Sequence, residues 1–298
     1  MLTGIIDVGS NSMRLSIFKH EADGTFLPVT SRKIIAGLVG YERNGKLTAK
    51  GEAKLCKCLM EFRFIIDALE VTDVHAIATA VFRRVINARE VSRRVYKKTG
   101  FKLEILSGEE EARLSYLGAR YSTNIKKGLV VDVGGASSEM IKVVGDGIGD
   151  LCSVPIGCLW LSLQANQHIF PSKDDISKMK AIIKQQLASA QRILEQPSST
   201  LCFVGGTARA AYRIAREIKF RDTRTIEPRE LSHIIRGFGK RDEEILQAVS
   251  FAAPERVFTL FAGLLIMQAV VDASKSTTLW ISKCGVREGY LIDNIIKC

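Results

Sequence analysis

Proline and aromatic residues are scarce in this chain of 298 residues, which has 6 Pro and 7% aromatic residues, and no segment has low complexity. The composition, with 46% hydrophobic and 25% charged residues, is that of a globular protein rather than a disordered or fibrous one. The 7 Cys are an odd number at irregular spacing. They indicate free thiols in a reducing compartment rather than a disulfide framework.

Long apolar runs and targeting signals are also lacking. The longest apolar run, from Val257 to Val271, is shorter than a membrane span and contains Thr and Gln, so it predicts a buried core helix. The first residues, "MLTGIIDVGS", begin a strand pattern without the charged segment and cleavage site of a signal peptide. We therefore expect a cytoplasmic protein with no membrane partner.

Acidic residues are fewer than basic ones: the chain has 32 Asp and Glu and 43 Lys and Arg, which gives a net charge of +11. Such an excess favours an anionic ligand, which includes nucleic acid, nucleotides, polyphosphate and membrane surfaces. Aromatic-rich strands that would stack on bases are absent, so nonspecific nucleic-acid binding is the weakest of these interpretations and no specific nucleic acid is expected.

Two stretches of the sequence resemble each other. "GIIDVGSNSMRLSIF" (4–18) and "GLVVDVGGASSEMIKV" (128–143) share an apolar strand, Asp-Val-Gly, a turn of small residues ending in Ser, and a second strand. The alignment of Asp7 with Asp132 also places Ser12 opposite Ser137 and Arg14 opposite Glu139. A repeat at this offset predicts a duplicated domain.

Strand and helix patterns alternate in both halves of the chain, which predicts α/β domains with mixed sheets. In the first half we expect a helix over 48–69, a strand over 73–80, a helix over 81–100 and a short strand over 101–106. In the second half we expect strands within 128–156, helices over 173–195, a strand, turn and helix over 201–215, helices over 227–273, a strand at "TTLWIS" and a last helix after "CGVREG".

Three consecutive glutamates open a helix in "SGEEEARLSY" (107–116). Ser107 and Glu110 fit a capping box, in which each side chain binds a free backbone N–H at the helix start. Glu109 in the first turn suits the positive end of the helix dipole. Glu111 is needed for neither task, which leaves it available for chemistry.

Several turns are suited to phosphate. The two hairpin turns offer backbone N–H groups and hydroxyls, and an Asp at each strand end is a hard ligand for a divalent cation. "FVGGTAR" (203–209) fits neither the P-loop nor the dinucleotide-binding motif, but a helix start there suits an anion, and tight packing explains it equally well. Arg83 follows a strand, where an arginine suits a phosphate clamp as well as an ordinary basic surface.

Taken together, these motifs resemble the exopolyphosphatase / guanosine pentaphosphate phosphatase family of the actin-like ATPase superfamily. The segments that carry the resemblance occur in the family's order over nearly the whole chain: "DVGSNSMRL" (7–15), "ATAVFRR" (78–84), "SGEEEARLSYLG" (107–118), "VVDVGGASSE" (130–139), "PIGCLWL" (155–161), "VGGTARA" (204–210) and "GVREG" (285–289). The resemblance implies two ribonuclease H-like (actin-like ATPase) α/β domains with a cleft between them. We expect one over 1–122, completed by the helix 286–298, and the other over 123–285.

The resemblance also implies roles for particular residues. Glu111 would be the general base that polarises the attacking water, and Arg83 would bind phosphate. Asp132 and Glu139, with Asp7 on the other hairpin, would hold Mg²⁺, which polyphosphate needs because bare carboxylates would repel it. The predicted phosphate-binding residues are Asn11, Ser12, Gly134, Gly135, Ser137, Gly205, Gly206 and Thr207.

The expected activity is Mg²⁺-dependent hydrolysis of the terminal phosphoanhydride of inorganic polyphosphate. Alternatives are guanosine pentaphosphate hydrolysis, a guanosine tetra- or pentaphosphate-binding protein with little turnover, and a kinase of the same superfamily. The chain departs from the family at Ala136, where a third glycine is usual, and it ends at residue 298 without the C-terminal helical region of longer members. That region helps to hold long polymers. The sequence leaves the oligomeric state open, and a homodimer is one of the states compatible with it.

Overall fold

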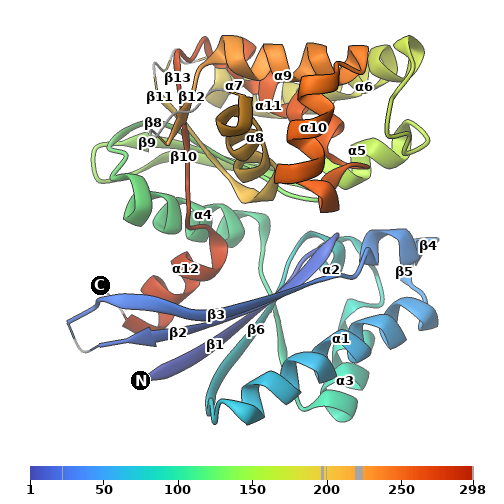
Figure 1. Ribbon diagram of the computed structural model, residues 1–298. Coiled ribbons are helices and arrows are strands. Elements are labelled where there is room, and N and C mark those ends of the chain that lie inside the picture. Colours follow the sequence, from blue (N-terminus) through green and yellow to red (C-terminus); the bar gives the residue numbers. More distant parts are fainter. Residues whose placement is uncertain (22, 196–197, 199, 219–223, 297–298) are drawn as a thin grey trace. The chain divides into compact units, whose positions relative to one another are not determined.

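The computed structural model describes residues 1–21, 23–195, 198, 200–218 and 224–296. The chain divides into two compact units, the first formed by Met1–Glu111 with Tyr290–Cys298 and the second by Ala112–Gly289. Helix α4 (Gly108–Thr123) therefore begins in the first unit and continues in the second. Figure 1 shows both units and labels most of their helices and strands.

The first unit is built on a five-stranded sheet with the order β3-β2-β1-β6-β7. Strands β1, β2 and β3 are antiparallel neighbours, and β6 and β7 continue the sheet in parallel with β1. The elements of this unit are β1 (Leu2–Val8), β2 (Ser12–His20), β3 (Phe26–Ile35), the 3-10 helix η1 (Leu38–Tyr41), β4 (Glu42–Arg43), β5 (Lys46–Leu47), α1 (Ala49–Ala68), β6 (Asp73–Ala78), α2 (Ala80–Arg84), α3 (Ala88–Thr99), β7 (Leu103–Ile105) and the π-helix η4 (Leu291–Ile296).

Alternation along the strands creates the core of the first unit. Ile6 and Val8 of β1 pack with buried residues of α1 and α3 on one face of the sheet. On the adjoining strand β6, His75 has the opposite parity to the core residues Ala76 and Ala78, and its ring contacts Tyr290. The C-terminal segment thus contributes to this unit through Tyr290.

The second unit has a six-stranded sheet with the order β10-β9-β8-β11-β13-β12. Its first three strands are antiparallel, and β11 and β13 are parallel with β8. The elements are β8 (Lys127–Val133), β9 (Ser138–Val144), β10 (Gly147–Val154), α5 (Cys158–Gln164), α6 (Lys173–Leu187), η2 (Ala188–Ala190), α7 (Gln191–Leu194), β11 (Thr200–Val204), α8 (Gly205–Ile218), β12 (Thr225–Ile226), α9 (Pro228–Lys240), α10 (Glu243–Ala252), η3 (Pro254–Arg256), α11 (Leu260–Ser274), β13 (Thr278–Ile281) and α12 (Val286–Tyr290).

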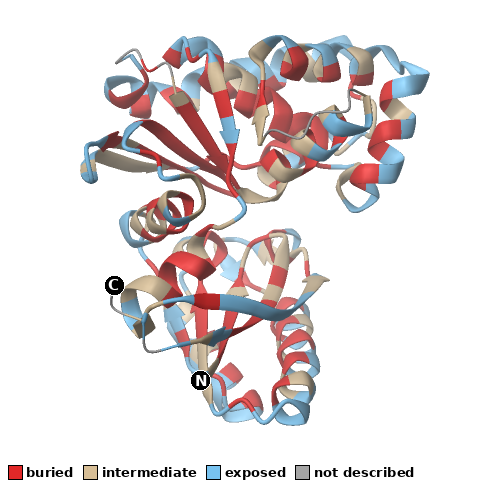
Figure 2. Cartoon of the chain, turned by 60° about the vertical axis from the view of Figure 1, so that its left-hand side comes forward, coloured by how far each residue is buried: buried red, intermediate tan, exposed pale blue. Residues whose placement is uncertain are grey.

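Strand β8 is buried on both faces (Figure 2), as expected for a central strand with helices on either side. Its residues Leu129, Val131 and Val133 belong to a core with helices α5 to α11. Val130 belongs to a separate core with Ala112, Tyr116 and Ala119 of α4. Asp132 has the same parity as Val130, so it lies on the α4 face of the sheet.

The two sheets repeat one topology, which confirms the internal repeat predicted from the sequence. β1-β2-β3 correspond to β8-β9-β10, and β6 and β11 are each the parallel neighbour of the first strand. Even the hairpin registers agree, because Asp7 pairs with Arg14 across β1 and β2, and Asp132 pairs with Glu139 across β8 and β9.

The prediction of a single helix over 81–100 is wrong, and the strand predicted over 73–80 ends at Ala78. Residues 81–100 form two helices, α2 and α3, instead of one. The side chain of Asn87 donates to Leu47 O and accepts from Leu47 N, both at 3.0 Å, and Ile86 N donates to Gly45 O at 2.8 Å. These bonds to the β4–β5 hairpin take the backbone out of the helix.

The predicted helix over 48–69 is confirmed as α1, capped by Thr48, whose hydroxyl accepts from Gly51 N. The strand and the helix predicted within 201–215 are confirmed as β11 and α8, and the turn between them is confined to the junction, because α8 begins at Gly205 directly after β11 ends at Val204. Gly205 has φ = 95°, a conformation that glycine adopts without strain.

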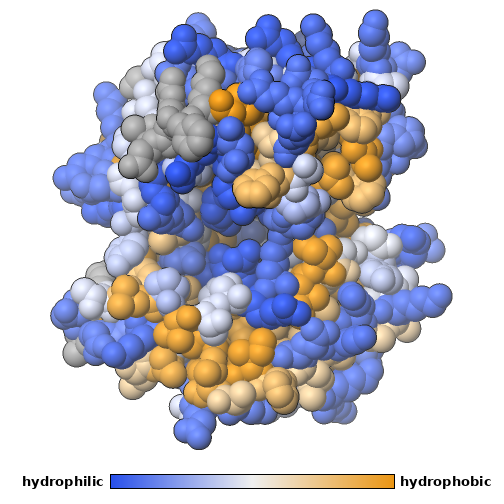
Figure 3. All heavy atoms as spheres, viewed as in Figure 1, coloured by the Kyte–Doolittle hydropathy of each residue, from blue (hydrophilic) through white to orange (hydrophobic). Residues whose placement is uncertain are grey.

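The predicted domain bounds, 1–122 with 286–298 and 123–285, remain predictions. The two compact units reflect contacts within the chain and meet inside α4, and such contacts do not define evolutionary domains. Val257–Val271 lies mostly in α11, whose residues are largely buried. None of the helices in the described ranges is long and apolar enough to span a membrane. Hydrophilic residues cover most of the face in Figure 3, with hydrophobic patches among them.

Candidate active site

The three glutamates at the start of α4 have three different environments. Ser107 N donates to Glu110 Oε2 at 2.7 Å, and Glu110 N donates to Ser107 Oγ at 3.1 Å, so the predicted capping box is confirmed. Glu109 is exposed in the first turn. Glu111, whose side chain is only 12% exposed, forms an ion pair with Arg83.

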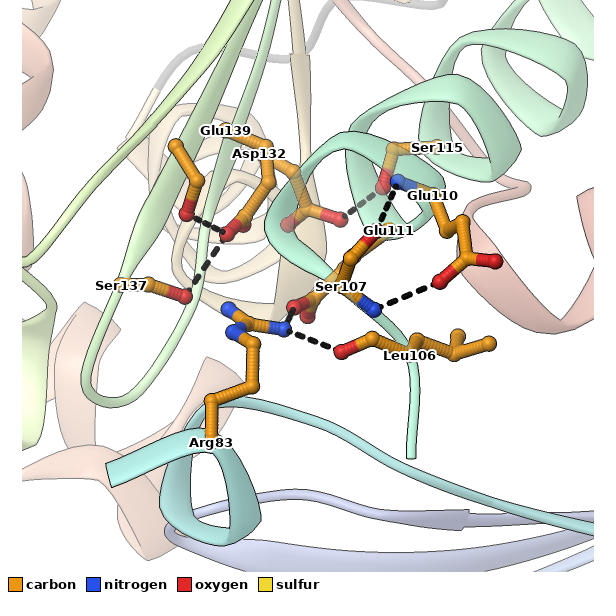
Figure 4. A network of polar contacts seen from close by, with 10 residues as sticks. Arg83, Leu106, Ser107, Glu110, Glu111, Ser115, Asp132, Ser137 and Glu139 are labelled. Carbon is orange, nitrogen blue, oxygen red and sulfur yellow. Dashed lines mark hydrogen bonds and ion pairs between the residues drawn. The ribbon is translucent and has the colours of Figure 1, made fainter. Parts of the chain in front are cut away.

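Arg83 and Glu111 are the two predicted catalytic residues, and the first unit brings them together (Figure 4). Arg83 Nη1 lies 2.5 Å from Glu111 Oε2 and also donates to Leu106 O at 3.2 Å. Arg83 stands in the short helix α2 after β6, and Glu111 stands after β7, the neighbouring parallel strand. Adjacent carboxyl ends of parallel strands are the usual place for a site in an α/β sheet.

The hairpin of β1 and β2 presents Asn11 and Ser12 at its tip. Gly9 N donates to Ser12 O at 3.2 Å, and the carbonyl of Asn11 accepts from Ala36 N and Gly37 N at 3.0 and 2.7 Å. The side chains of Asn11 and Ser12 are half-buried and have no hydrogen-bond partner within the described chain. Asp7 also lies on this hairpin, half-buried near its strand end.

The hairpin of β8 and β9 repeats this turn, with Gly134 N donating to Ser137 O at 3.0 Å. The first amides of α5 bind its carbonyl groups: Cys158 N donates to Gly134 O at 2.9 Å and Leu159 N to Gly135 O at 3.0 Å. In a trans peptide the N–H points opposite to the C=O. The N–H groups of Gly135 and Ala136 therefore point away from α5, as a phosphate-binding loop requires.

Ala136, where the family usually has glycine, fits this loop because its neighbour is small. A Cβ on Gly157 would lie 2.4 Å from Ala136 N and 2.4 Å from the carbonyl carbon of Gly135, so Gly157 allows the backbones to touch. The methyl group of Ala136 is itself buried. The departure at 136 therefore leaves the loop's hydrogen bonds intact.

Asp132 and Glu139 are paired residues of β8 and β9 and are both buried, Glu139 to 1% exposure. Ser115 Oγ of α4 donates to Asp132 Oδ2 at 2.7 Å. Glu139 Oε1 accepts from Ser137 Oγ at 2.7 Å and from Ser153 Oγ at 2.8 Å. Figure 4 shows both carboxylates with the hydroxyl groups of Ser115 and Ser137.

Burial raises the pKa of Asp132 above its usual value. The hydrogen bond from Ser115 and the charges of Arg209 and Arg287 oppose this rise, and Glu288 adds to it. A buried carboxylate is costly to keep ionised unless a cation compensates it. Its donor chemistry, with that of Glu139, fits a hard divalent cation.

No group of three or more His, Cys, Asp or Glu side chains within the described ranges is arranged to hold a metal ion. Mg²⁺ is commonly held by one or two carboxylates together with substrate phosphates and water, so the paired Asp132 and Glu139 fit this mode of binding. Asp7, the third predicted ligand, lies on the hairpin of the first unit, and its role remains a prediction.

The first residue of α8, Gly205, lies in direct contact with Asp132. A Cβ on Gly205 would lie 2.7 Å from Asp132 Oδ1, so only glycine leaves room for the carboxylate. Gly206 and Thr207 follow in the first turn, where backbone N–H groups suit an anion. The hydroxyl of Thr207 is buried without a hydrogen-bond partner, which leaves its N–H as the group that could meet a phosphate.

Arg256 is a candidate residue that the sequence interpretation missed. Its Nη2 would lie 1.7 Å from a Cβ on Gly206, so the guanidinium group rests directly on the first turn of α8, and the side chain is 13% exposed. Arg256 comes from η3, fifty residues after Gly206 in the chain. The only signal in the sequence is an arginine after proline just before the apolar helix α11.

The "GVREG" segment packs on α4 through glycine. A Cβ on Gly118 would lie 2.2 Å from Gly285 O, and a Cβ on Gly289 would lie 1.9 Å from Leu114 O. Backbone contact at these two points places the buried Arg287 and Glu288 close enough to Asp132 to affect its pKa. Arg287 of this segment favours the ionised carboxylate of Asp132, and Glu288 opposes it.

A fold of two repeated α/β units, with an acidic hairpin, glycine-containing turns that suit phosphate and an arginine–glutamate pair, is typical of phosphoryl-transfer enzymes of the actin-like type. Comparison with known proteins identifies the family. The model of the Ppx/GppA phosphatase family matches residues 16–297. The chain belongs to this family and is a phosphatase.

Relatives and solved structures agree with this assignment. The chain is 27% identical to exopolyphosphatase 1 of Mycobacterium bovis over 98% of this chain and 88% of that protein, and 26% identical to exopolyphosphatase 1 of Mycobacterium leprae over 98% and 89%. It is similar to the crystal structure of the Ppx/GppA family member of Aquifex aeolicus, with a TM-score of 0.80 and 25% identity over 100% and 98% of the chains.

The fold is also that of an exopolyphosphatase from Cytophaga hutchinsonii, with a TM-score of 0.87 and 19% identity over 98% and 96% of the chains. The actin-like ATPase fold and the family, both expected from the sequence motifs, are therefore confirmed. The roles of the individual site residues stay predictions.

Proposed function

We propose that this phosphatase hydrolyses the terminal phosphoanhydride of inorganic polyphosphate and releases orthophosphate. The observation that carries the proposal is the Arg83–Glu111 pair at 2.5 Å. In this pair, Glu111 is a carboxylate that takes no part in helix capping, and Arg83 is a cation that suits a terminal phosphate. The curated relatives named exopolyphosphatase 1 support the choice of polyphosphate.

Glu111 acts as the general base in this proposal. Its carboxylate accepts a proton from water as the water oxygen forms a bond to the terminal phosphorus. The bridging P–O bond breaks, and the leaving chain, one phosphate shorter, keeps the electron pair of that bond. Glu111 then gives up the proton to solvent or to the products, which restores the carboxylate.

Arg83 positions Glu111 in the free enzyme and binds the terminal phosphate in the complex. Its Nη1 donates to Leu106 O and to Glu111, which fixes the guanidinium group beside the carboxylate. A guanidinium group is a planar fork of N–H donors, and this geometry suits the oxygens of a terminal phosphate. Arg83 therefore brings the base and the reacting phosphorus together, as phosphoryl transfer requires.

The loop of Gly134, Gly135 and Ser137, the start of α8 at Gly205, Gly206 and Thr207, and the tip residues Asn11 and Ser12 bind further phosphate oxygens in this proposal. Arg256 adds a positive charge beside Gly206. Asp132 and Glu139, with Asp7, would hold Mg²⁺, which neutralises phosphate charge when bound. The protein's part is to orient the terminal phosphate toward Glu111.

Phosphate release tests the proposal. Polyphosphates of several lengths, guanosine pentaphosphate and ATP are compared with Mg²⁺ present. We expect release from polyphosphate without any acceptor molecule, which a kinase would not give. Faster release from guanosine pentaphosphate at equal concentration would favour that substrate instead. Tight binding of guanosine tetraphosphate without release from any compound would indicate a binding protein.

We also propose that the enzyme works in the cytoplasm as a homodimer. The six cysteines in the described part of the chain are all free thiols, as expected in a reducing compartment. Fractionation of cells and light scattering of the purified protein test the two statements. A secreted protein or a strict monomer would contradict them.

A further inference from the structure

A pocket separate from the candidate active-site residues lies in the first unit, on the face of the sheet covered by α3. It has a volume of about 590 Å³ and is lined by Arg89, Ser92, Arg93 and Tyr96 of α3 with Lys102, Leu103 and Ile105 at the edge strand β7. None of these residues is a candidate active-site residue. A pocket of this size is ordinary for a small ligand.

The positive charges of this pocket are not neutralised by the protein. Arg89, Arg93 and Lys102 form no ion pair with any side chain in the described ranges. On the other side of the same helix, Arg94 and Lys98 both bind the buried carboxylate of Glu52, at 2.8 and 3.0 Å. One side of the helix thus has satisfied cations, whereas Arg89 and Arg93 on its other side, with Lys102 next to β7, place three cations around the pocket.

The rest of the lining is suited to a flat ring. Leu103 and Ile105 face the α3 side of the edge strand and form an apolar floor. Tyr96 is a wall of the pocket and is 56% exposed, although large aromatic side chains are usually covered. The Ser92 hydroxyl is buried and has no partner within the described chain, so a polar ring edge would satisfy it.

From this lining we propose that the pocket binds a nucleoside diphosphate or a nucleotide with more phosphates. The base lies against Tyr96 and the floor of Leu103 and Ile105, and the phosphates lie between Arg89, Arg93 and Lys102. A bare phosphate chain would use the cations but would leave the aromatic wall and the apolar floor without a partner. The inference does not rest on the proposed function, because no residue is shared between the two sites.

Calorimetric titration of the full chain tests this site, with GDP, ADP, guanosine and pyrophosphate as separate probes. We expect GDP or ADP to bind more tightly than guanosine or pyrophosphate, because only a nucleotide fills both parts of the pocket. Tyr96→Ala should weaken nucleotide binding by about five-fold or more, as expected for the loss of base stacking, and Tyr96→Phe should retain it. Arg93→Ala should also weaken it.

The controls separate this pocket from the active site. Lys57→Ala, at an exposed position of α1, should leave nucleotide binding unchanged. Tyr96→Ala should leave phosphate release from tripolyphosphate unchanged. The inference is overturned if pyrophosphate binds as tightly as GDP, if Tyr96→Ala binds nucleotide like the wild type, or if Arg83→Ala abolishes the binding while Arg93→Ala does not.

Discussion

Glu111 accepts a hydrogen bond from Arg83 at 2.5 Å, and its neighbour Glu110 instead closes the capping box with Ser107. Two adjacent glutamates of one helix thus differ in the contacts that they make. Glu110 stabilises the start of the helix. Glu111 pairs with Arg83, which follows a different strand, β6. The comparison of the two positions is the sharpest test of the site.

We expect Glu111→Gln to lower turnover by about a hundred-fold or more, because the amide cannot accept the proton from water. The Michaelis constant should change little, since Gln preserves the size of the side chain. Steady-state phosphate release measures both. Glu110→Gln is the matched control and should be nearly neutral, because Gln still completes a capping box. A larger loss of turnover in Glu110→Gln, with stability intact, would reverse the assignment.

Metal dependence tests the acidic hairpin. Activity should require a divalent cation, and both Asp132→Ala and Glu139→Ala should lower the rate and weaken the response to Mg²⁺ together. Titration of Mg²⁺ against phosphate release gives both quantities. Glu139 is buried and holds two serine hydroxyls, so Glu139→Gln is the milder variant that keeps the packing. Full activity in excess chelator would exclude a metal at this site.

Asp132→Asn should stabilise the metal-free protein at neutral pH while it abolishes activity. Burial raises the pKa of Asp132 in the folded state, so its ionisation weakens the fold at pH values above the unfolded pKa of about 3.9. Asn removes this penalty and can still accept the hydrogen bond from Ser115. The gain in Tm should therefore be present at pH 7 and shrink toward pH 4.

Thermal unfolding in chelator at several pH values measures this effect. Asp67→Asn, at a side chain that is 64% exposed, is the control and should show no comparable gain. A lower Tm for Asp132→Asn at pH 7 would mean that the charges of Arg209 and Arg287 outweigh the cost of burial.

The glycine contacts between α4 and "GVREG" carry a stability prediction. A methyl group at Gly289 would lie 1.9 Å from Leu114 O, a backbone atom that cannot move aside. Gly289→Ala should therefore cost about 1–3 kcal/mol or more of unfolding free energy. Gly40→Ala is the control, because Gly40 has no neighbour within 4 Å of its Cβ position. Denaturant unfolding that gave the same stability for both variants would contradict the backbone contact.

Features that depend on neighbouring residues were predictable from the sequence. The capping box of Ser107 and Glu110 is set by residues three apart, and the repeated hairpins need only an Asp, a turn of small residues and alternating strands. The family resemblance added Arg83 and Glu111, which the structure then brought together.

Features that depend on distant partners were not predictable. The break before α3 is caused by hydrogen bonds from Asn87 to Leu47, forty residues earlier in the chain. Arg256 of η3 reaches Gly206, at the start of α8, although the two residues are fifty positions apart in the chain. The helical periodicity of the sequence cannot predict either contact, because both depend on tertiary packing.

The last prediction concerns substrate length and salt. The net charge of +11, with Arg and Lys frequent between Arg209 and Lys240, indicates a basic surface beyond the active site, although residues 219–223 lie outside the described part of the chain. A long polyphosphate would contact such a surface at many points, and each contact releases counterions, so its affinity should fall steeply with salt. Guanosine pentaphosphate has fewer charges and should show a shallower slope.

We measure the Michaelis constant of both substrates across a salt series, with tripolyphosphate as the short control. Long or medium chains should be the better substrates at moderate salt. Equal slopes for all three, or a clear preference for guanosine pentaphosphate, would show that the excess charge serves another purpose.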